Sequence, residues 1–292
     1  MTVLLQQLIN GLSIGSVYAL MAVGYSLVYS IMNFSNFAHG GVIMIGAYIG
    51  FFVMTLLGAP FWVAFIVCGL GTGLIAVTLE RLVYRPLRNR NAPFLYFIIS
   101  AMGASIFLEN FVIATIGPTF RTYPRVFAGG PFQIGALSVG RIDVVMIIVA
   151  ALGLLILTLI IEKTKVGLGI RASSYNIKAS TLMGVNVNVV IFTIFLLGGI
   201  LAGYAGMLFG MKYTVYPQIG AITTKSFIAA VFGGLGSLPG AIVGSVLLGL
   251  LETMTSAYIS SNFRDLIAFV VLIGVLVLRP SGLMGKITED KA

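Results

Sequence analysis

The chain has 292 residues, of which 59% are apolar and only 9% are charged, with a formal net charge of +9. An average soluble domain is about a quarter charged. This composition excludes a soluble enzyme, a disordered chain and a nucleic-acid-binding protein, and it indicates an integral membrane protein built from helices.

Apolar stretches of about 20 residues, the length that crosses a bilayer, follow one another along the chain. We predict an all-α polytopic bundle of about eight or nine spans with broken or re-entrant helices, forming a single domain over residues 1–292. One stretch, 219–236, contains Lys225 and ends in a glycine-rich run, so it is either a full crossing or a re-entrant helix. The other predicted crossings are 8–31, 40–58, 61–80, 93–116, 142–161, 188–210, 239–258 and 264–279.

Pairs of glycines four residues apart recur within the predicted crossings. This spacing lets helix backbones approach closely in a membrane. The sequence therefore predicts a compact bundle, with close contacts at Gly11–Gly15, Gly46–Gly50, Gly69–Gly73, Gly199–Gly203, Gly206–Gly210 and Gly240–Gly244.

The first two predicted crossings are joined by residues 32–41, where two asparagines, a serine and a histidine interrupt the apolar sequence. Unpaired polar groups are costly in hydrocarbon, so these side chains should face protein, water or the membrane boundary. Two interpretations remain open. Either a broken helix lines a path, with Asn33, Asn36 and His39 as path or gate residues, or the segment is a tight turn whose asparagines cap the next helix.

The basic residues predict the orientation of the bundle, because cytoplasmic loops carry an excess of lysine and arginine. They place the N-terminus and the segment 117–141 outside, and the loop 162–187 and the C-terminus inside. The outer segment contains three prolines and a glycine pair, which predict irregular structure with short strands or half-helices. The residues used are Arg81, Arg85, Arg88, Arg90, Lys163, Lys165, Arg171, Lys178, Arg279, Lys286 and Lys291; Arg121, Arg125 and Arg141 lie on the other side.

Few charges lie within the predicted crossings, and such charges are candidates for function. We hypothesise that Lys225 and Glu252 pair inside the bundle and belong to the path or its gate. Glu109 and Asp265 lie near crossing ends, where placement at the membrane interface is expected.

The sequence argues against an enzymatic activity of this chain. Residues 11–15 match the G-x-S-x-G pattern, but within an apolar helix rather than at a strand–helix turn, so an intramembrane hydrolase using Ser13 and His39 is disfavoured. One histidine and one cysteine cannot form a zinc site, and we expect no metal or cofactor. The chain lacks a P-loop, so an ATP-driven process would need a partner protein.

The predicted cytoplasmic loop 162–187 contains a stretch from Ala172 to Met183 that mixes helix formers with polar residues and is followed by Gly184, a natural helix stop. We expect one short amphipathic helix here. It either lies on the lipid surface or docks a soluble cytoplasmic partner.

Four segments in order give the chain a resemblance over nearly its full length to the LivH-type permease subunits of bacterial branched-chain amino-acid ABC importers. They are N-F-S-N-F-A-H-G-G at 33–41, G-I-R-A at 169–172 followed by L-M-G-V-N at 182–186, G-I-L-A-G-Y-A-G at 199–206, and V-F-G-G-L-G-S-L-P-G at 231–240. Where the family commonly has acidic residues in the docking loop, this chain has Ser174, Tyr175 and Asn176, so a neutral Asn176 would replace an acidic contact.

The resemblance implies a permease subunit in the bacterial plasma (inner) membrane that transports branched-chain or related amino acids and is not itself an enzyme. Its implied partners are a second permease subunit, cytoplasmic ATP-binding subunits and an extracytoplasmic substrate-binding protein. The alternative is a stand-alone secondary transporter or channel for small polar solutes. The residues implied in ATPase docking are Arg171, Ala172, Asn176, Lys178, Leu182 and Gly184.

Overall fold

The computed structural model describes residues 2–124, 126–127, 129–135 and 137–285, and most of them are helical. Seven helical segments are long and apolar enough to cross a membrane. Their boundaries agree with the predicted crossings to within a few residues, except at the N-terminus and near residue 80, where the helices are longer. The long elements are α1 (Thr2–Met32), α3 (Phe61–Leu79) continued by η1 (Glu80–Tyr84) and α4 (Arg85–Asn89), α5 (Phe94–Ile116), α6 (Arg141–Lys163), α9 (Val187–Lys212), α11 (Leu238–Tyr258), and η3 (Ser261–Phe263) continued by α12 (Arg264–Leu278).

Two predicted crossings are shorter than a full span. The second is α2 (His39–Thr55), a helix of 17 residues. The stretch predicted at 219–236 is split between a 3-10 turn, η2 (Pro217–Ile222), and a helix of 11 residues, α10 (Thr223–Gly233). The predicted all-α bundle is therefore confirmed, and the helices long and apolar enough to cross a membrane number seven within the described residues.

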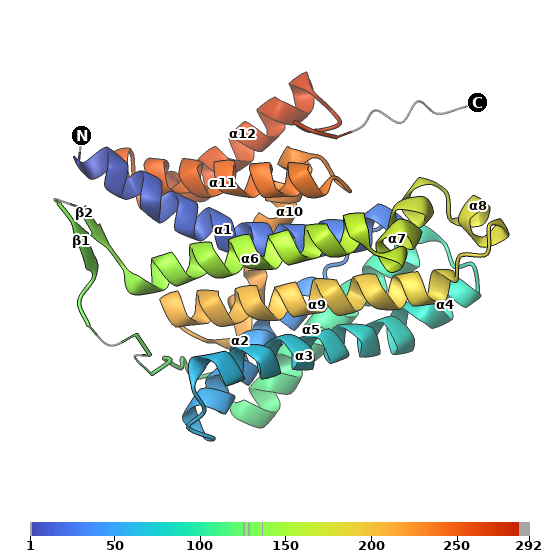
Figure 1. Ribbon diagram of the computed structural model, residues 1–292, viewed down its shortest axis with the longest axis horizontal. Helices are drawn as coiled ribbons and strands as arrows, with labels where there is room; N and C mark the ends of the chain where they lie inside the picture. The colour runs from blue at the N-terminus through green and yellow to red at the C-terminus, as the bar shows by residue number, and fades with distance from the viewer. Residues whose placement is uncertain (1, 125, 128, 136, 286–292) are drawn as a thin grey trace.

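The two ends of the bundle carry different structures (Figure 1). At one end, here called the hairpin end, β1 (Phe132–Ile134) and β2 (Leu137–Val139) form an antiparallel hairpin next to the start of α1. At the other, the basic end, lie α4, α7 (Lys165–Tyr175) and α8 (Ile177–Leu182). The two basic loops of the sequence therefore share one end. Arg125, Lys286 and Lys291, used in predicting the orientation, lie outside the described residues.

The hairpin end is tied to the bundle by side chains. The Gln6 amide donates to the Ser138 carbonyl oxygen at 2.8 Å and accepts from the Ser138 N–H at 3.0 Å. Arg121 pairs with Val215 through two backbone hydrogen bonds, and the Tyr123 hydroxyl donates to the Ala47 carbonyl at 2.6 Å. The predicted irregular segment with short strands is thus confirmed, and it is fixed to α1, α2 and the end of α9.

Glycines line the closest helix contacts, as their spacing predicts. An added Cβ at Gly15 would lie 2.9 Å from the Val246 Cα of α11, and one at Gly46 would lie 2.6 Å from the Gly203 Cα of α9. In a membrane, where lipid is as apolar as leucine, such close backbone packing drives helix association. The glycine pairs therefore hold α1 against α11 and α2 against α9.

We expect replacement of Gly206 by alanine to lower the thermal unfolding midpoint of the protein. A Cβ at Gly206 would overlap the Ile43 carbonyl oxygen, a backbone atom that moves only if α2 and α9 separate. Gly103 on α5 is the matched control, since a Cβ there would meet nothing within 4 Å. A Gly206→Ala midpoint as high as that of Gly103→Ala, measured in detergent, would contradict this packing.

Candidate functional site

The basic end presents two short helices where the sequence predicted one. The helix expected from Ala172 to Met183 is wrong: α7 ends at Tyr175 and α8 begins at Ile177. The break lies at Asn176, whose side-chain oxygen accepts the Ala179 N–H at 3.0 Å and so caps a new helix. Gly184, at φ +86°, ends α8 as predicted, since only glycine takes this conformation readily.

The tip formed by α8 and its flanks exposes apolar side chains. Leu182 is 88% exposed, Met183 is 84% exposed and Tyr175 is 90% exposed. Leu182 was predicted as a docking residue, whereas Tyr175 and Met183 were not. Both residues adjoin a helix boundary: Met183 precedes the predicted stop at Gly184, and Tyr175 precedes the break at Asn176, which was not predicted. We call Tyr175, Leu182 and Met183 the α8 tip.

The other predicted docking residues differ in what they contact. The Arg171 guanidinium donates to the Ile161 carbonyl oxygen in the last turn of α6, so it fastens α7 to that helix. Ala172 is half-buried, and Lys178 is exposed. Thr164 accepts the Gly167 N–H at 3.0 Å and caps the start of α7. The α8 tip is thus carried on a locally ordered support.

The three predicted path residues between α1 and α2 have different surroundings in the structure. Asn33 is exposed, at φ +53°, and its N–H bonds to the Tyr29 carbonyl beyond the end of α1. Asn36 is buried and its side-chain oxygen accepts from the Tyr84 hydroxyl at 2.7 Å. His39 is buried, with Nε2 3.2 Å from the Met21 carbonyl oxygen. The N-cap of α2 is Ala38 with no side-chain cap, so the interpretation in which asparagines cap α2 is wrong.

The segment after α1 folds back into the bundle. His39 lies beside the middle of α1, because a Cβ on Gly24 would approach its ring carbon Cε1 to 3.1 Å. Since α1 continues to Met32, the chain returns past the last turns of that helix before α2 begins. Asn36 and His39 therefore lie at an internal helix break.

A series of contacts runs from this break toward the basic end. Tyr84, which bonds to Asn36, belongs to the π-helical turn η1 that starts at the buried Glu80. Arg88 donates to Glu80 at 3.0 Å and to the Asn188 side-chain oxygen at 2.8 Å. Asn188 is in the first turn of α9, directly after the loop that holds α8, so these contacts link that loop to the break.

Lys225 and Glu252 form the ion pair hypothesised from the sequence. Their Nζ and Oε1 atoms are 2.7 Å apart, and Glu252 is only 3% exposed. Lys225 also lies 2.8 Å from Asp265, and Tyr18 donates its hydroxyl to the other Glu252 oxygen at 2.9 Å. These contacts join α10 to α1, α11 and α12. Asp265, expected at a membrane interface, is largely exposed.

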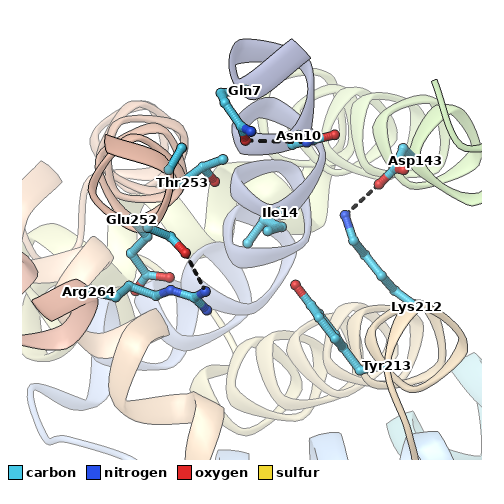
Figure 2. Close-up of a pocket in the computed structure, with 11 residues that line it drawn as sticks. Gln7, Asn10, Ile14, Asp143, Lys212, Tyr213, Glu252, Thr253 and Arg264 are labelled. Atoms are coloured by element: carbon cyan, nitrogen blue, oxygen red, sulfur yellow. Dashed lines mark hydrogen bonds and ion pairs between the residues drawn. The ribbon is translucent and has the colours of Figure 1, made fainter. Parts of the chain in front are cut away.

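A cavity of about 390 Å³ opens near the hairpin end (Figure 2). Side chains from α1, α6, α9, α11 and α12 surround it, and they carry both signs of charge: Asp143, Lys212, Glu252 and Arg264. Lys212 lies 2.5 Å from Asp143. Burial raises the pKa of Tyr213 above its ordinary value, so its hydroxyl stays protonated at this cavity.

The serine of the G-x-S-x-G match has no histidine beside it among the described residues. The Ser13 hydroxyl donates to Asp143 at 2.7 Å, and that carboxylate is already paired with Lys212. His39 instead bonds to the Met21 carbonyl. This geometry gives the hydrolase alternative no support.

Comparison with known proteins identifies the family. Residues 7–276 match the family described as branched-chain amino acid transport system / permease component. The high-affinity branched-chain amino acid transport system permease protein LivH of Escherichia coli (strain K12) is 38% identical, over 98% of this chain and 97% of the relative. The corresponding protein BraD of Pseudomonas aeruginosa is also 38% identical, with the same coverage.

A more distant relative, the probable branched-chain amino acid transport permease protein LivH of Methanocaldococcus jannaschii, is 28% identical over 91% of this chain and 88% of the relative. No solved structure matches the chain significantly. These relatives are transporter components, and the predicted multi-pass location in the bacterial inner membrane is confirmed with them. The chain belongs to the family of permease components of branched-chain amino acid transport systems.

Proposed function

We propose that this chain is the membrane subunit of an ATP-driven ABC importer for branched-chain or related amino acids. The proposal rests on the match to the permease family, which covers nearly the whole chain. The chain acts as a single membrane domain over residues 1–292, with eight crossings if one of α2 and the η2–α10 pair crosses the membrane and nine if both do. A second, related permease subunit completes the translocation path.

Cytoplasmic ATP-binding subunits supply the energy for transport through this subunit. The basic end faces the cytoplasm, in keeping with the positive-inside rule. Its α8 tip offers three exposed, largely apolar side chains on and beside a capped helix, which is the anchor type that interface pockets bury. Lys178 and Asn176 flank the tip, while Arg171, Ala172 and Gly184 hold it in place. A substrate-binding protein delivers the amino acid to the hairpin end.

The path uses the two broken regions of the bundle. Asn36 and His39 lie at one break, and Lys225 and Glu252 secure the other, so both pairs are candidates for the gate. Asn33, at the exposed end of α1, contributes to the turn that leads into the first break. Non-helical backbone at membrane depth is tolerated where protein or a water-filled path surrounds it.

Reconstitution tests the proposal. The chain is co-purified with its candidate ATP-binding and permease subunits and placed in proteoliposomes with the binding protein outside. We expect uptake of tritiated leucine, isoleucine or valine that requires both ATP and the binding protein. Uptake by the chain alone, driven by an ion gradient, would instead establish the stand-alone transporter.

A further inference from the structure

A second cavity, of about 310 Å³, lies between α2, α5, η2 and α10. Its volume is in the range of small-molecule sites in proteins, and it shares no lining residue with the cavity of Figure 2. The larger apolar side chains of its wall are Phe37, Met44, Met102 and Ile106. The cavity therefore offers an apolar surface to a ligand of modest size.

Glu109 brings a negative charge to this cavity. It lies on α5, seven residues before the helix ends, and is half-buried. No lysine, arginine or histidine among the described residues is within ion-pair distance of it, whereas Asp143 and Glu252 at the other cavity are both paired. A carboxylate within a membrane span marks a functional site by default, and an ammonium group in the cavity would neutralise it.

Thr223 places a buried hydroxyl without a partner among the described residues in the wall of the same cavity. Thr223 is 5% exposed, lines the cavity, and its hydroxyl has no hydrogen-bond partner among the described residues. A buried polar group without a partner is costly, so a ligand that bonds to it is stabilised. Thr224 and the Gln218 amide line the cavity as well.

The start of α10 favours a negative group at this place. Thr223 is its first residue, and the positive end of a helix dipole stabilises a nearby anion. The Thr223 N–H already bonds to the Gly220 and Ala221 carbonyls, so the hydroxyl and amide side chains are the available donors. Groups suited to a carboxylate and to an ammonium thus meet around one apolar cavity.

We infer that this cavity binds an α-amino acid zwitterion with an apolar side chain. The ligand's ammonium pairs with Glu109, its carboxylate accepts from Thr223 and its neighbours, and its side chain packs on Met102 and Ile106. The inference rests on the proposed function and names a substrate site within it. Binding is weak, because a site on a transport path must also release its ligand.

The test measures binding of tritiated leucine to the assembled transporter in nanodiscs, without the substrate-binding protein. Two competitors distinguish the two polar groups of the ligand: 4-methylpentanoate lacks the ammonium, and 3-methylbutylamine lacks the carboxylate. We expect Glu109→Gln to weaken leucine about tenfold and not to weaken 4-methylpentanoate, which has no ammonium to pair with the carboxylate. Thr223→Val should weaken leucine and leave 3-methylbutylamine unchanged. Each loss disappears when the ligand lacks the group concerned.

Two variants are matched controls. Ser226→Ala removes another buried, unpartnered hydroxyl of α10 that does not line the cavity. Glu162→Gln removes an exposed carboxylate at the far end of α6. Both should bind leucine as the wild type does. Equal losses in these controls, or equal effects of Glu109→Gln on leucine and 4-methylpentanoate, would overturn the inference.

The remaining outcomes distinguish failure of the proposed binding site from failure of the proposed transport function. A transporter that imports leucine yet shows no binding up to about 10 mM would refute the site alone. Binding with the expected analogue pattern in a preparation that imports no amino acid would refute the proposed function and retain the site. If leucine binds only when phosphatidylethanolamine is omitted from the nanodisc, the cavity holds a lipid ammonium and the inference is wrong.

Discussion

Replacing both Leu182 and Met183 with serine is expected to release the ATP-binding subunits from this chain. Both side chains are almost fully exposed, so the change removes partner contacts without disturbing packing inside the chain. Burying one such side chain contributes about 2 kcal/mol, and the pair therefore corresponds to a loss of affinity of about a hundredfold or more. The measurement is a titration of the purified permease with its ATP-binding subunits.

Leu168→Ser serves as the control for this prediction. Leu168 is also an exposed leucine of the basic end, but it lies near the start of α7, about two helical turns before Tyr175, and is not part of the α8 tip. Its substitution should leave the titration unchanged. Undiminished binding by the Leu182, Met183 double variant would show that α8 is not the docking element and would favour an interfacial helix on the lipid.

Replacing Lys225 with methionine is expected to destabilise the protein strongly. The change leaves Glu252 as a buried carboxylate whose remaining hydrogen bond among the described residues comes from the Tyr18 hydroxyl. Breaking a buried ion pair in this way costs about 3 kcal/mol. Asp265, the other partner of Lys225, is largely exposed and adds little to this loss. The thermal unfolding midpoint in detergent should fall clearly below that of the wild type.

A second substitution distinguishes lost charge from lost packing. Adding Glu252→Gln to Lys225→Met removes the stranded charge and should restore most of the midpoint, and exchanging the two charges should restore part of it. Lys178→Met, at an exposed lysine with no carboxylate in ion-pair range among the described residues, should have no effect. If the double variant were less stable than Lys225→Met alone, the pair would not have the role described.

The sequence predicted the long helices well because a bilayer imposes a length on each of them. The crossing predicted at 142–161 is α6, Arg141–Lys163, and the one at 188–210 is α9, Val187–Lys212. The Lys225–Glu252 pair was also predictable, since few other charges lie within the crossings. Both predictions rest on the cost of placing polar groups in hydrocarbon.

The details of the candidate sites depend on contacts that the sequence does not contain. Asn176 could continue a helix or cap a new one, and only the position of α8 shows that it caps. Arg171 donates to a backbone carbonyl ten residues earlier in the chain. That carbonyl is available as an acceptor because it lies in the last turn of α6. Glu109 and Thr223 share a cavity although 114 positions separate them along the chain. No hydrophobic periodicity or motif spacing in the sequence predicts that Glu109 and Thr223 line the same cavity.

The glycine contacts between α1 and α11, and between α2 and α9, have an entropic consequence. Ordering a long side chain at an interface costs up to about 2 kcal/mol in rotamer freedom, whereas a glycine has no side-chain rotamers to lose. Backbone surfaces such as those of Gly15 and Val246 therefore associate without that cost. Lipid supplies no hydrophobic driving force between helices, so the bundle depends on the weak dispersion forces of these contacts. Because packing at glycines costs less conformational entropy, these forces suffice to hold the helices together.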